Sequence, residues 1–183
     1  MNFESAKSQL TKVLVTEEQI KTRVAELAAE IDAKYQGKEV VLVGVLKGAI
    51  MFMADLSRAL SIPTSMDWMA LSSYGSGTVS SGVIRIRKDL DAEIHGKHVI
   101  IVEDIIDSGL TLSWLQTTLN SRGAASVEVV AFLRKPAAAK VEVPVWLVGY
   151  DIPNEFVVGY GLDYNEQYRT LNCVAVLDPK VYS

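Results

Sequence analysis

Apolar residues recur every three or four positions between residues 16 and 36, on one face of a predicted amphipathic helix. The residues of this face are Ile20, Val24, Leu27, Ala28 and Ile31. Thr16 and Gln19 have the spacing of a capping box, which favours a helix start at this point. Gly37 is a suitable residue to end the helix.

Short apolar runs rich in β-branched residues predict strands that are buried on both faces. These runs are 40–46, 98–105, 126–133 and 143–150. Helical patterns follow the first two runs, at 49–60 and 109–122. Because strands alternate with helices, we expect an α/β domain with a mainly parallel twisted sheet flanked by helices.

Two further strands are predicted at 66–71 and 83–88, on either side of a segment rich in Gly and Ser at 72–82. The segment is too long for a tight hairpin turn. It is either a passive loop or a flap over a ligand, and its composition alone favours the passive loop. The last stretch, 151–183, carries Gly, Tyr and Asp residues before a final apolar run at 173–177. No internal repeat is apparent, so we expect residues 1–183 to form a single domain.

Composition and charge narrow the class of protein. The chain has 183 residues, 49% of them hydrophobic and 22% charged, as is ordinary for a globular domain. Its longest apolar run is too short to cross a bilayer, and its start lacks a secretory signal, so we expect a cytoplasmic protein without membrane association. Cys173 is the single cysteine and there are two histidines, which argues against a zinc cluster. A net charge of −4 argues against a general nucleic-acid binder.

The stretch "VEDIIDSGLT" (102–111) concentrates acids and small residues where a predicted strand ends and a helix begins. In parallel sheets, ligands bind beyond the carboxyl ends of the strands. Residues 108–111 would direct free backbone amides outward from a helix N-terminus, which suits a phosphate group. The alternative is simple N-capping of the helix by Asp107 or Ser108.

Capping does not explain Glu103 and Asp104, which precede the turn. Neighbouring residues on a strand point to opposite faces, so both reach one ligand only where the strand ends. Carboxylates next to a phosphate site need a cation such as Mg²⁺, or ribose hydroxyls. The chain lacks G-x-x-x-x-G-K-[ST], and "GSGTVS" (75–80) lacks the third glycine of a dinucleotide fingerprint. A P-loop kinase and a Rossmann dehydrogenase therefore fit poorly.

"VEDIIDSGLT" resembles the signature of the phosphoribosyltransferases, enzymes that use phosphoribosyl pyrophosphate (PRPP). The segments "GVLKGA" (44–49), "SSYGSG" (72–77), "RKP" (134–136) and "IPNEFVVGYGLDYNEQYRTLNCV" (152–174) resemble the bacterial hypoxanthine (hypoxanthine-guanine) branch. The resemblance runs from about residue 13 to residue 179. It implies the type I phosphoribosyltransferase fold, in which terminal segments form a small hood. The hood segment would be 151–174, and 72–82 would be a flexible catalytic flap.

The resemblance also implies roles on the phosphoribosyl side. Glu103 and Asp104 would hold the ribose hydroxyls and a first Mg²⁺, and Asp107 would be the catalytic base or acid at purine N7. The 5′-phosphate would bind to the turn formed by Ser108, Gly109, Leu110 and Thr111. Lys47 and Gly48 would contact pyrophosphate, with a cis peptide bond between Leu46 and Lys47. Ser108 stands where many relatives have Thr, and Leu110 where some have a polar residue.

On the purine side, the resemblance implies that Lys135 donates a hydrogen bond to O6, which selects hypoxanthine or guanine over adenine. Phe156 would stack on the purine, and the backbone of Val157 would contact its edge. Asp163 would hold a second Mg²⁺, and Arg169 would pair with pyrophosphate. The flap would carry Ser73 and Tyr74, which reverses the passive reading of 72–82.

The implied function is purine salvage, with transfer of the 5-phosphoribosyl group from PRPP to hypoxanthine and guanine. The products would be IMP or GMP and pyrophosphate, and the reaction would need Mg²⁺. The alternatives are a xanthine-preferring phosphoribosyltransferase, a PRPP-fold regulator that binds RNA, and a non-catalytic α/β domain. The last leaves the three acids unexplained. By resemblance we expect a homo-oligomer, a dimer or a tetramer, with neither nucleic acid nor membrane as a partner.

Overall fold

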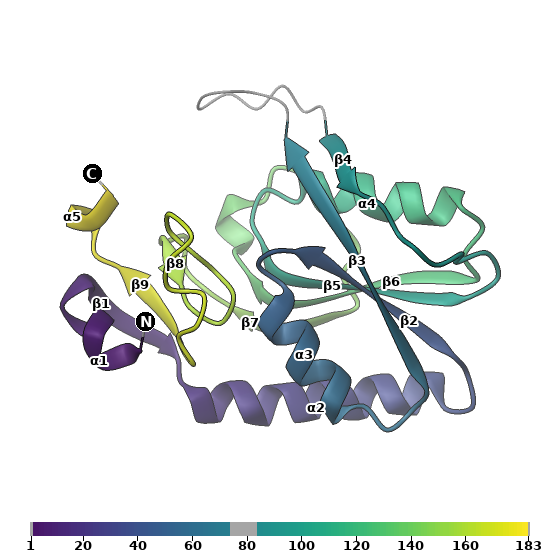
Figure 1. Ribbon diagram of the computed structural model, residues 1–183, viewed down its shortest axis with the longest axis horizontal. Coiled ribbons are helices and arrows are strands. Elements are labelled where there is room, and N and C mark those ends of the chain that lie inside the picture. The colour runs from purple at the N-terminus through teal and green to yellow at the C-terminus, as the bar shows by residue number, and fades with distance from the viewer. Residues whose placement is uncertain (1, 74–83, 183) are drawn as a thin grey trace.

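A six-stranded sheet forms the centre of the computed structural model, which describes residues 2–73 and 84–182 (Figure 1). The strands lie in the order β4-β3-β2-β5-β6-β7. Their bounds are Val40–Leu46 for β2, Thr64–Ser73 for β3, Ile84–Lys88 for β4, His98–Ile106 for β5, Ser126–Arg134 for β6 and Leu147–Asp151 for β7. All neighbours pair in parallel except β3 and β4, which are antiparallel. The predicted α/β class with a mainly parallel sheet is confirmed.

Helices cover both faces of this sheet because the central strands β2, β5 and β6 are apolar over most of their length. Alternate residues of β2 point to opposite faces. Val40 and Leu42 pack with α2 (Glu17–Tyr35) and α3 (Ile50–Ala59), whereas Val41 and Val43 pack with α4 (Leu110–Ser121). The continuous β-branched run thus corresponds to two hydrophobic layers, one on each side of the sheet.

The N-terminus of α2 has the predicted capping box. The Thr16 hydroxyl accepts a hydrogen bond from the Gln19 N–H at 3.3 Å, and the Gln19 side chain accepts one from the Thr16 N–H at 2.8 Å. The helix ends before Gly37, which has a φ of 73°. Local sequence signals therefore determine both ends of this helix.

A second, three-stranded sheet is built from the two ends of the chain and forms the hood (Figure 1). Its order is β1-β9-β8, with bounds Leu10–Val15, Val174–Leu177 and Val157–Val158. Short helical turns flank it: α1 (Phe3–Ala6), the 3-10 turn Lys7–Gln9 and α5 (Pro179–Tyr182). The predicted small hood of terminal segments is confirmed, and both chain ends lie beside it in Figure 1.

Two strand predictions differ from the structure. The strand predicted at 143–150 begins only at Leu147, because its pairing with β6 starts at Val130 opposite Leu147. Pro144 lies in the part of the predicted strand that does not pair, and it has no N–H group for a hydrogen bond to a neighbouring strand. The strand predicted at 66–71 is longer and reaches Ser73, and residues 74–82 of the predicted flap lie outside the described residues. Among the described residues, no helix has the length and hydropathy needed to cross a bilayer.

Candidate active site

A cleft of about 410 Å³ opens beyond the carboxyl ends of β2, β5 and β6 and beneath the hood. Most of the site residues predicted from the sequence line it. They are Lys47, Gly48, Glu103, Asp104, Asp107, Lys135, Phe156, Val157, Asp163 and Arg169. This is the edge of a parallel sheet where ligands bind in α/β proteins.

The acid pair lies at the end of β5, where the strand leaves the sheet. Glu103 is 7% exposed and Asp104 is partly buried. Burial raises the pKa of Glu103 well above its ordinary value, and the negative charge of Asp104 raises it further. Burial also raises the pKa of Asp104 to about 6, although the Ile105 N–H donates to its carboxylate at 2.9 Å and Arg169 opposes the shift. Two adjacent carboxylates in such a place favour binding of a cation.

The turn after β2 lies directly against this pair. A Cβ atom on Gly48 would lie 1.7 Å from Asp104 Oδ2, so only glycine fits here. The Leu46–Lys47 peptide bond is cis, as the sequence resemblance implies. The hood reaches the same turn, since a Cβ atom on Gly161 would lie 1.9 Å from the carbonyl oxygen of Gly48. The strand turn and the hood therefore form one continuous wall of the cleft.

Arg169 organises the cationic side of the cleft. Its Nη2 atom lies 2.8 Å from Asp163 Oδ1, and its Nη1 atom donates to the Gly161 carbonyl at 2.8 Å. Glu166 bridges two cations, at 3.3 Å from Arg169 Nη2 and 3.0 Å from Lys47 Nζ. Arg169 Nε is buried, and the described part of the chain offers it no acceptor. The guanidinium is thus fixed in place with a donor still to be satisfied.

Lys135 and Asp107 lie at the other end of the cleft. Lys135 is 8% exposed and follows β6, and its Nζ atom lies 3.9 Å from Asp107 Oδ2. The Asp107 carboxylate itself is accessible, with 59% of the side chain exposed. Phe156 is 40% exposed and lines the same space, together with Ile105. A flat apolar ring, an ammonium and a carboxylate thus surround one volume.

The turn at 108–111 forms an adjoining hollow, which shares Glu103, Ile105 and Asp107 with the cleft. Gly109 occupies the N-cap position of α4 with a φ of 79°, and no side chain caps the helix. This differs from the alternative of simple capping by Asp107 or Ser108, although the Leu110 N–H donates a long hydrogen bond to Ser108 Oγ, at 3.5 Å. The N–H groups of Lys140 and Val141 donate to the Ser108 carbonyl at 3.0 and 3.3 Å and brace the turn. The amides of α4 that follow Leu110 are therefore available to an anion.

The donor set fits a hard divalent cation that also binds substrate oxygens. Mg²⁺ is usually held by one or two carboxylates together with phosphate groups and water. The raised pKa values of Glu103 and Asp104 are the signature of carboxylates without a neutralising partner. No cluster of three or more His, Cys, Asp or Glu side chains capable of holding a metal occurs within the described ranges. A bound substrate would thus supply part of the coordination.

Sequence reasoning missed several residues of the site. Ile105 and Leu162 line the cleft, and Glu166 bridges Lys47 and Arg169. The place of Ile105 between the acid pair and Asp107 was a usable signal, but nothing in the sequence indicates the ion pairs of Glu166. Of the predicted turn, Ser108, Gly109 and Thr111 line the adjoining hollow, whereas Leu110 does not and its side chain is 37% exposed.

The roles predicted for the two flap residues stay predictions. Tyr74 lies outside the described residues. Ser73 is the last residue of β3 and pairs with Ile84 of β4.

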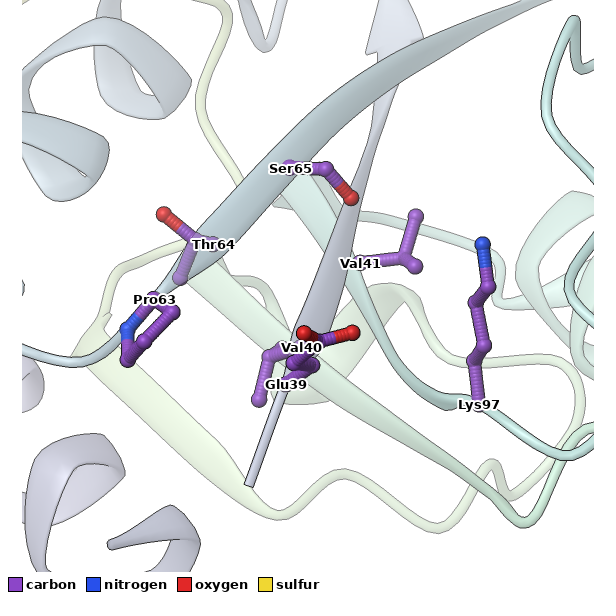
Figure 2. Close-up of a pocket in the computed structure, with 7 residues that line it drawn as sticks. All are labelled: Glu39, Val40, Val41, Pro63, Thr64, Ser65 and Lys97. Atoms are coloured by element: carbon purple, nitrogen blue, oxygen red, sulfur yellow. The ribbon is translucent and has the colours of Figure 1, made fainter. Parts of the chain in front are cut away.

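A second hollow lies at the opposite edge of the sheet, where β2 and β3 begin (Figure 2). It has a volume of about 230 Å³, and Glu39, Pro63, Thr64, Ser65 and Lys97 contribute to its lining. It lies at the amino ends of the parallel strands, away from the edge where ligands bind in this class of fold. We therefore assign the candidate site to the cleft.

Comparison with known proteins agrees with this fold and cleft. The family model described as "Phosphoribosyl transferase domain" matches residues 12–165. The hypoxanthine-guanine phosphoribosyltransferase of Mycobacterium tuberculosis is 54% identical over 179 residues, which cover 94% of this chain and 89% of the relative. The enzyme of the same name from Bacillus subtilis is 48% identical over 176 residues, or 96% of this chain and 98% of the relative.

A solved structure gives the same result. The crystal structure of a hypoxanthine phosphoribosyltransferase from Staphylococcus aureus superimposes with a TM-score of 0.95 at 46% identity, covering 98% of this chain and 97% of that chain. The chain therefore belongs to the phosphoribosyltransferase family, in its hypoxanthine phosphoribosyltransferase branch, and is an enzyme of that class.

Proposed function

We propose that the enzyme transfers the 5-phosphoribosyl group of PRPP to hypoxanthine and to guanine, in purine salvage, and releases pyrophosphate. The observation that carries this proposal is the pair formed by Lys135 and Asp107. A buried ammonium lies 3.9 Å from an accessible carboxylate, with Phe156 lining the same cleft.

This pair matches one edge of a 6-oxopurine. O6 and N7 are neighbours on that edge, and O6 is a hydrogen-bond acceptor. The Lys135 ammonium donates to O6, and the Asp107 carboxylate accepts the proton carried by N7. Adenine has an amino group at the same position, which would face the ammonium with donors only. Phe156 supplies a ring for stacking, and the backbone of Val157 contacts the purine edge.

The phosphoribosyl group fits the opposite side of the same cleft. The 5′-phosphate binds to the turn formed by Ser108, Gly109, Leu110 and Thr111 at the start of α4. The ribose hydroxyls lie against Glu103 and Asp104. Pyrophosphate binds to Lys47, Gly48 and Arg169, whose unsatisfied Nε atom is a suitable donor for a phosphate oxygen.

A divalent cation belongs to this arrangement. Glu103 and Asp104 would hold a first Mg²⁺ and Asp163 a second, and the bound ions would neutralise charge on the leaving pyrophosphate. The two buried carboxylates with raised pKa values support this assignment.

The reaction forms the C1′–N9 bond and breaks the bond between C1′ and the pyrophosphate oxygen. Asp107 accepts the N7 proton as N9 attacks, so the product leaves without a positive charge on the purine. Lys47 and Arg169 stabilise the negative charge that develops on pyrophosphate. The bonding pair of the broken C1′–O bond stays on pyrophosphate, and water must be excluded while C1′ is electron-poor.

The test is product formation from hypoxanthine and PRPP, followed by chromatography, with Mg²⁺ and with EDTA. We expect IMP and pyrophosphate in equal amounts with Mg²⁺ and no turnover with EDTA. Failure to form IMP in the presence of Mg²⁺ would overturn the proposal.

A xanthine-preferring enzyme and an RNA-binding regulator are the competing functions. The xanthine enzyme would use the same Lys135 and Asp107 edge, so a comparison of bases decides between them. The regulator leaves Lys135 and Phe156 without a role, and filter binding to RNA tests it. Cytoplasmic location remains a prediction from the sequence, and a dimeric or tetrameric state remains a prediction from the sequence resemblance.

A further inference from the structure

Tyr160 of the hood is buried, with 6% of the residue exposed, and its hydroxyl donates to Asp55 Oδ2 on α3 at 2.8 Å. Its ring packs on Phe132, with the ring centroids 4.8 Å apart. Burial and the Asp55 carboxylate raise the pKa of Tyr160 above its ordinary value, so the hydroxyl keeps its proton for this bond. The other oxygen of Asp55 pairs with Arg58. None of the contacts described for Tyr160 and Asp55 is with a residue that lines the cleft.

The two ends of this hydrogen bond belong to the two segments that form the wall of the cleft. Asp55 lies on α3, which begins at Ile50, directly after the Lys47–Gly48 turn. Tyr160 precedes Gly161, whose Cα approaches the Gly48 carbonyl so closely that no Cβ would fit. Contact between the turn and the hood at this point depends on how α3 and residue 160 are held.

The backbone of Tyr160 needs such support. Its φ is 50°, which places a non-glycine residue in the left-handed region. Gly161 follows with a φ of 101°, and its carbonyl accepts the hydrogen bond from Arg169 Nη1. A shift of Tyr160 would therefore move the acceptor that orients Arg169 and, through Arg169, the ion pair with Asp163.

We propose that Tyr160 and Asp55 form a positioning pair that sets the distance between the Lys47–Gly48 turn and the Gly161–Arg169 part of the hood. The pair thereby determines the affinity for the pyrophosphate end of the substrate. This inference rests on the proposed function, since it takes PRPP as the ligand of these groups. Neither residue touches substrate, and both act through Gly48, Gly161 and Arg169.

The chain supplies a matched control in Tyr150. Its ring also packs on Phe132, at 5.8 Å, and its hydroxyl also donates one hydrogen bond to another element, to the Gln19 carbonyl at 3.0 Å. Gln19 lies on α2, which contributes no residue to the lining of the cleft. Tyr150→Phe thus removes one tyrosine hydrogen bond between two elements without affecting the turn or the hood.

The experiment compares Tyr160→Phe, Tyr150→Phe and wild type by steady-state kinetics and thermal unfolding. We expect Tyr160→Phe to raise KM for PRPP roughly tenfold, the scale of one hydrogen bond to a charged group. KM for hypoxanthine should stay within about twofold of wild type, because Lys135 and Phe156 are not displaced. Tyr150→Phe should leave both KM values unchanged, with a smaller loss in Tm, because its hydrogen bond is made to a neutral carbonyl.

A double-mutant cycle with Asp55→Ala, which removes the acceptor of the Tyr160 hydroxyl, separates coupling from a general loss of stability. We expect Asp55→Ala to raise KM for PRPP, and Tyr160→Phe to add little to it. Additive effects, or a KM for PRPP in Tyr160→Phe within twofold of that in Tyr150→Phe, would overturn the positioning pair. If the wild type itself forms no IMP, it is the proposed function that fails, so the two failures are distinguishable.

Discussion

Gly161 and Gly48 are in contact through their backbones, and this contact joins the hood to the sheet. A Cβ atom on Gly161 would lie 1.9 Å from the Gly48 carbonyl oxygen, which is too close for any side chain. Gly48 in turn leaves no room for a Cβ atom against Asp104. Three chain segments that are distant in sequence thus meet at one point of the cleft.

Gly161→Ala should therefore lower the free energy of unfolding by more than the strain of an alanine at positive φ would alone. The added methyl group meets rigid backbone, which costs about 1–3 kcal/mol beyond the backbone strain. Gly96→Ala is the matched control, because Gly96 has a φ of 72° but nothing lies within 4 Å of the position that a Cβ atom would take there. Urea unfolding of both variants measures the difference in free energy. Equal losses in the two variants would show that the contact between Gly161 and Gly48 is not tight in solution.

Asp104→Asn should stabilise the ligand-free protein at neutral pH while it impairs catalysis. Burial raises the pKa of Asp104 from 3.8 to about 6, so the folded state binds this proton more tightly than the unfolded state. The wild type consequently loses stability as pH rises through this window, by about 3 kcal/mol in total. The stability gained by Asp104→Asn should be near zero below pH 4 and reach its full value above pH 7, as measured by urea unfolding with EDTA present.

Asp89→Asn is the control, because its effect on stability at pH 7 should have the opposite sign to that of Asp104→Asn. The hydrogen bonds from Arg122, at 2.7 and 2.9 Å, lower the pKa of Asp89. This carboxylate contributes stability above its unfolded pKa that is lost as pH falls, so its removal should destabilise the protein at pH 7. If Asp104→Asn also destabilises the protein at pH 7, the ionised Asp104 does not reduce the stability of the ligand-free protein, which would contradict its raised pKa.

Asp107→Asn should lower turnover by roughly 10²–10⁴-fold, the usual effect of losing a positioned base. The amide retains the shape of the side chain, and the phosphate turn at 108–111 is untouched, so affinity for PRPP should change little. Single-turnover kinetics with hypoxanthine and a separate binding titration with PRPP check the two parts. Turnover within a few-fold of wild type would exclude Asp107 as the base.

Lys135→Ala should weaken the use of hypoxanthine and guanine without affecting the binding of PRPP. The loss of one charge-assisted hydrogen bond costs about 1.5–3 kcal/mol, which corresponds to roughly 10–100-fold in kcat/KM for the purine. Lys140→Ala is a control on the loop that follows, since the Lys140 side chain is exposed. Unaltered purine kinetics in Lys135→Ala would mean that the purine lies elsewhere in the cleft.

The central sheet and the acid-rich turn were predictable because their signals are local. The β-branched runs of β2, β5 and β6 specify strands covered on both faces, and the Thr16–Gln19 capping box marks the start of α2. The "VEDIIDSGLT" stretch carries its acids and the turn proposed to bind phosphate within ten residues, so one segment indicates much of the candidate site.

The hood and the cationic wall depend on contacts between distant residues. Val13 pairs with Ala175, at opposite ends of the chain, and no strand was predicted at the position of β1. Glu166 reaches Lys47 only because residues 165 and 166 adopt positive φ values, which the sequence Asn-Glu does not specify. The hydrogen bond between Tyr160 and Asp55 likewise joins elements about a hundred residues apart.

The most direct test of the central claim is a comparison of four bases under identical conditions. Initial rates of nucleotide formation from PRPP and Mg²⁺ are measured with hypoxanthine, guanine, xanthine and adenine. If the buried Lys135 ammonium and the Asp107 carboxylate read O6 and N7, hypoxanthine and guanine are converted and adenine is not. Conversion of adenine at a rate comparable with hypoxanthine would contradict this assignment of the site, and a clear preference for xanthine would contradict the proposed base specificity.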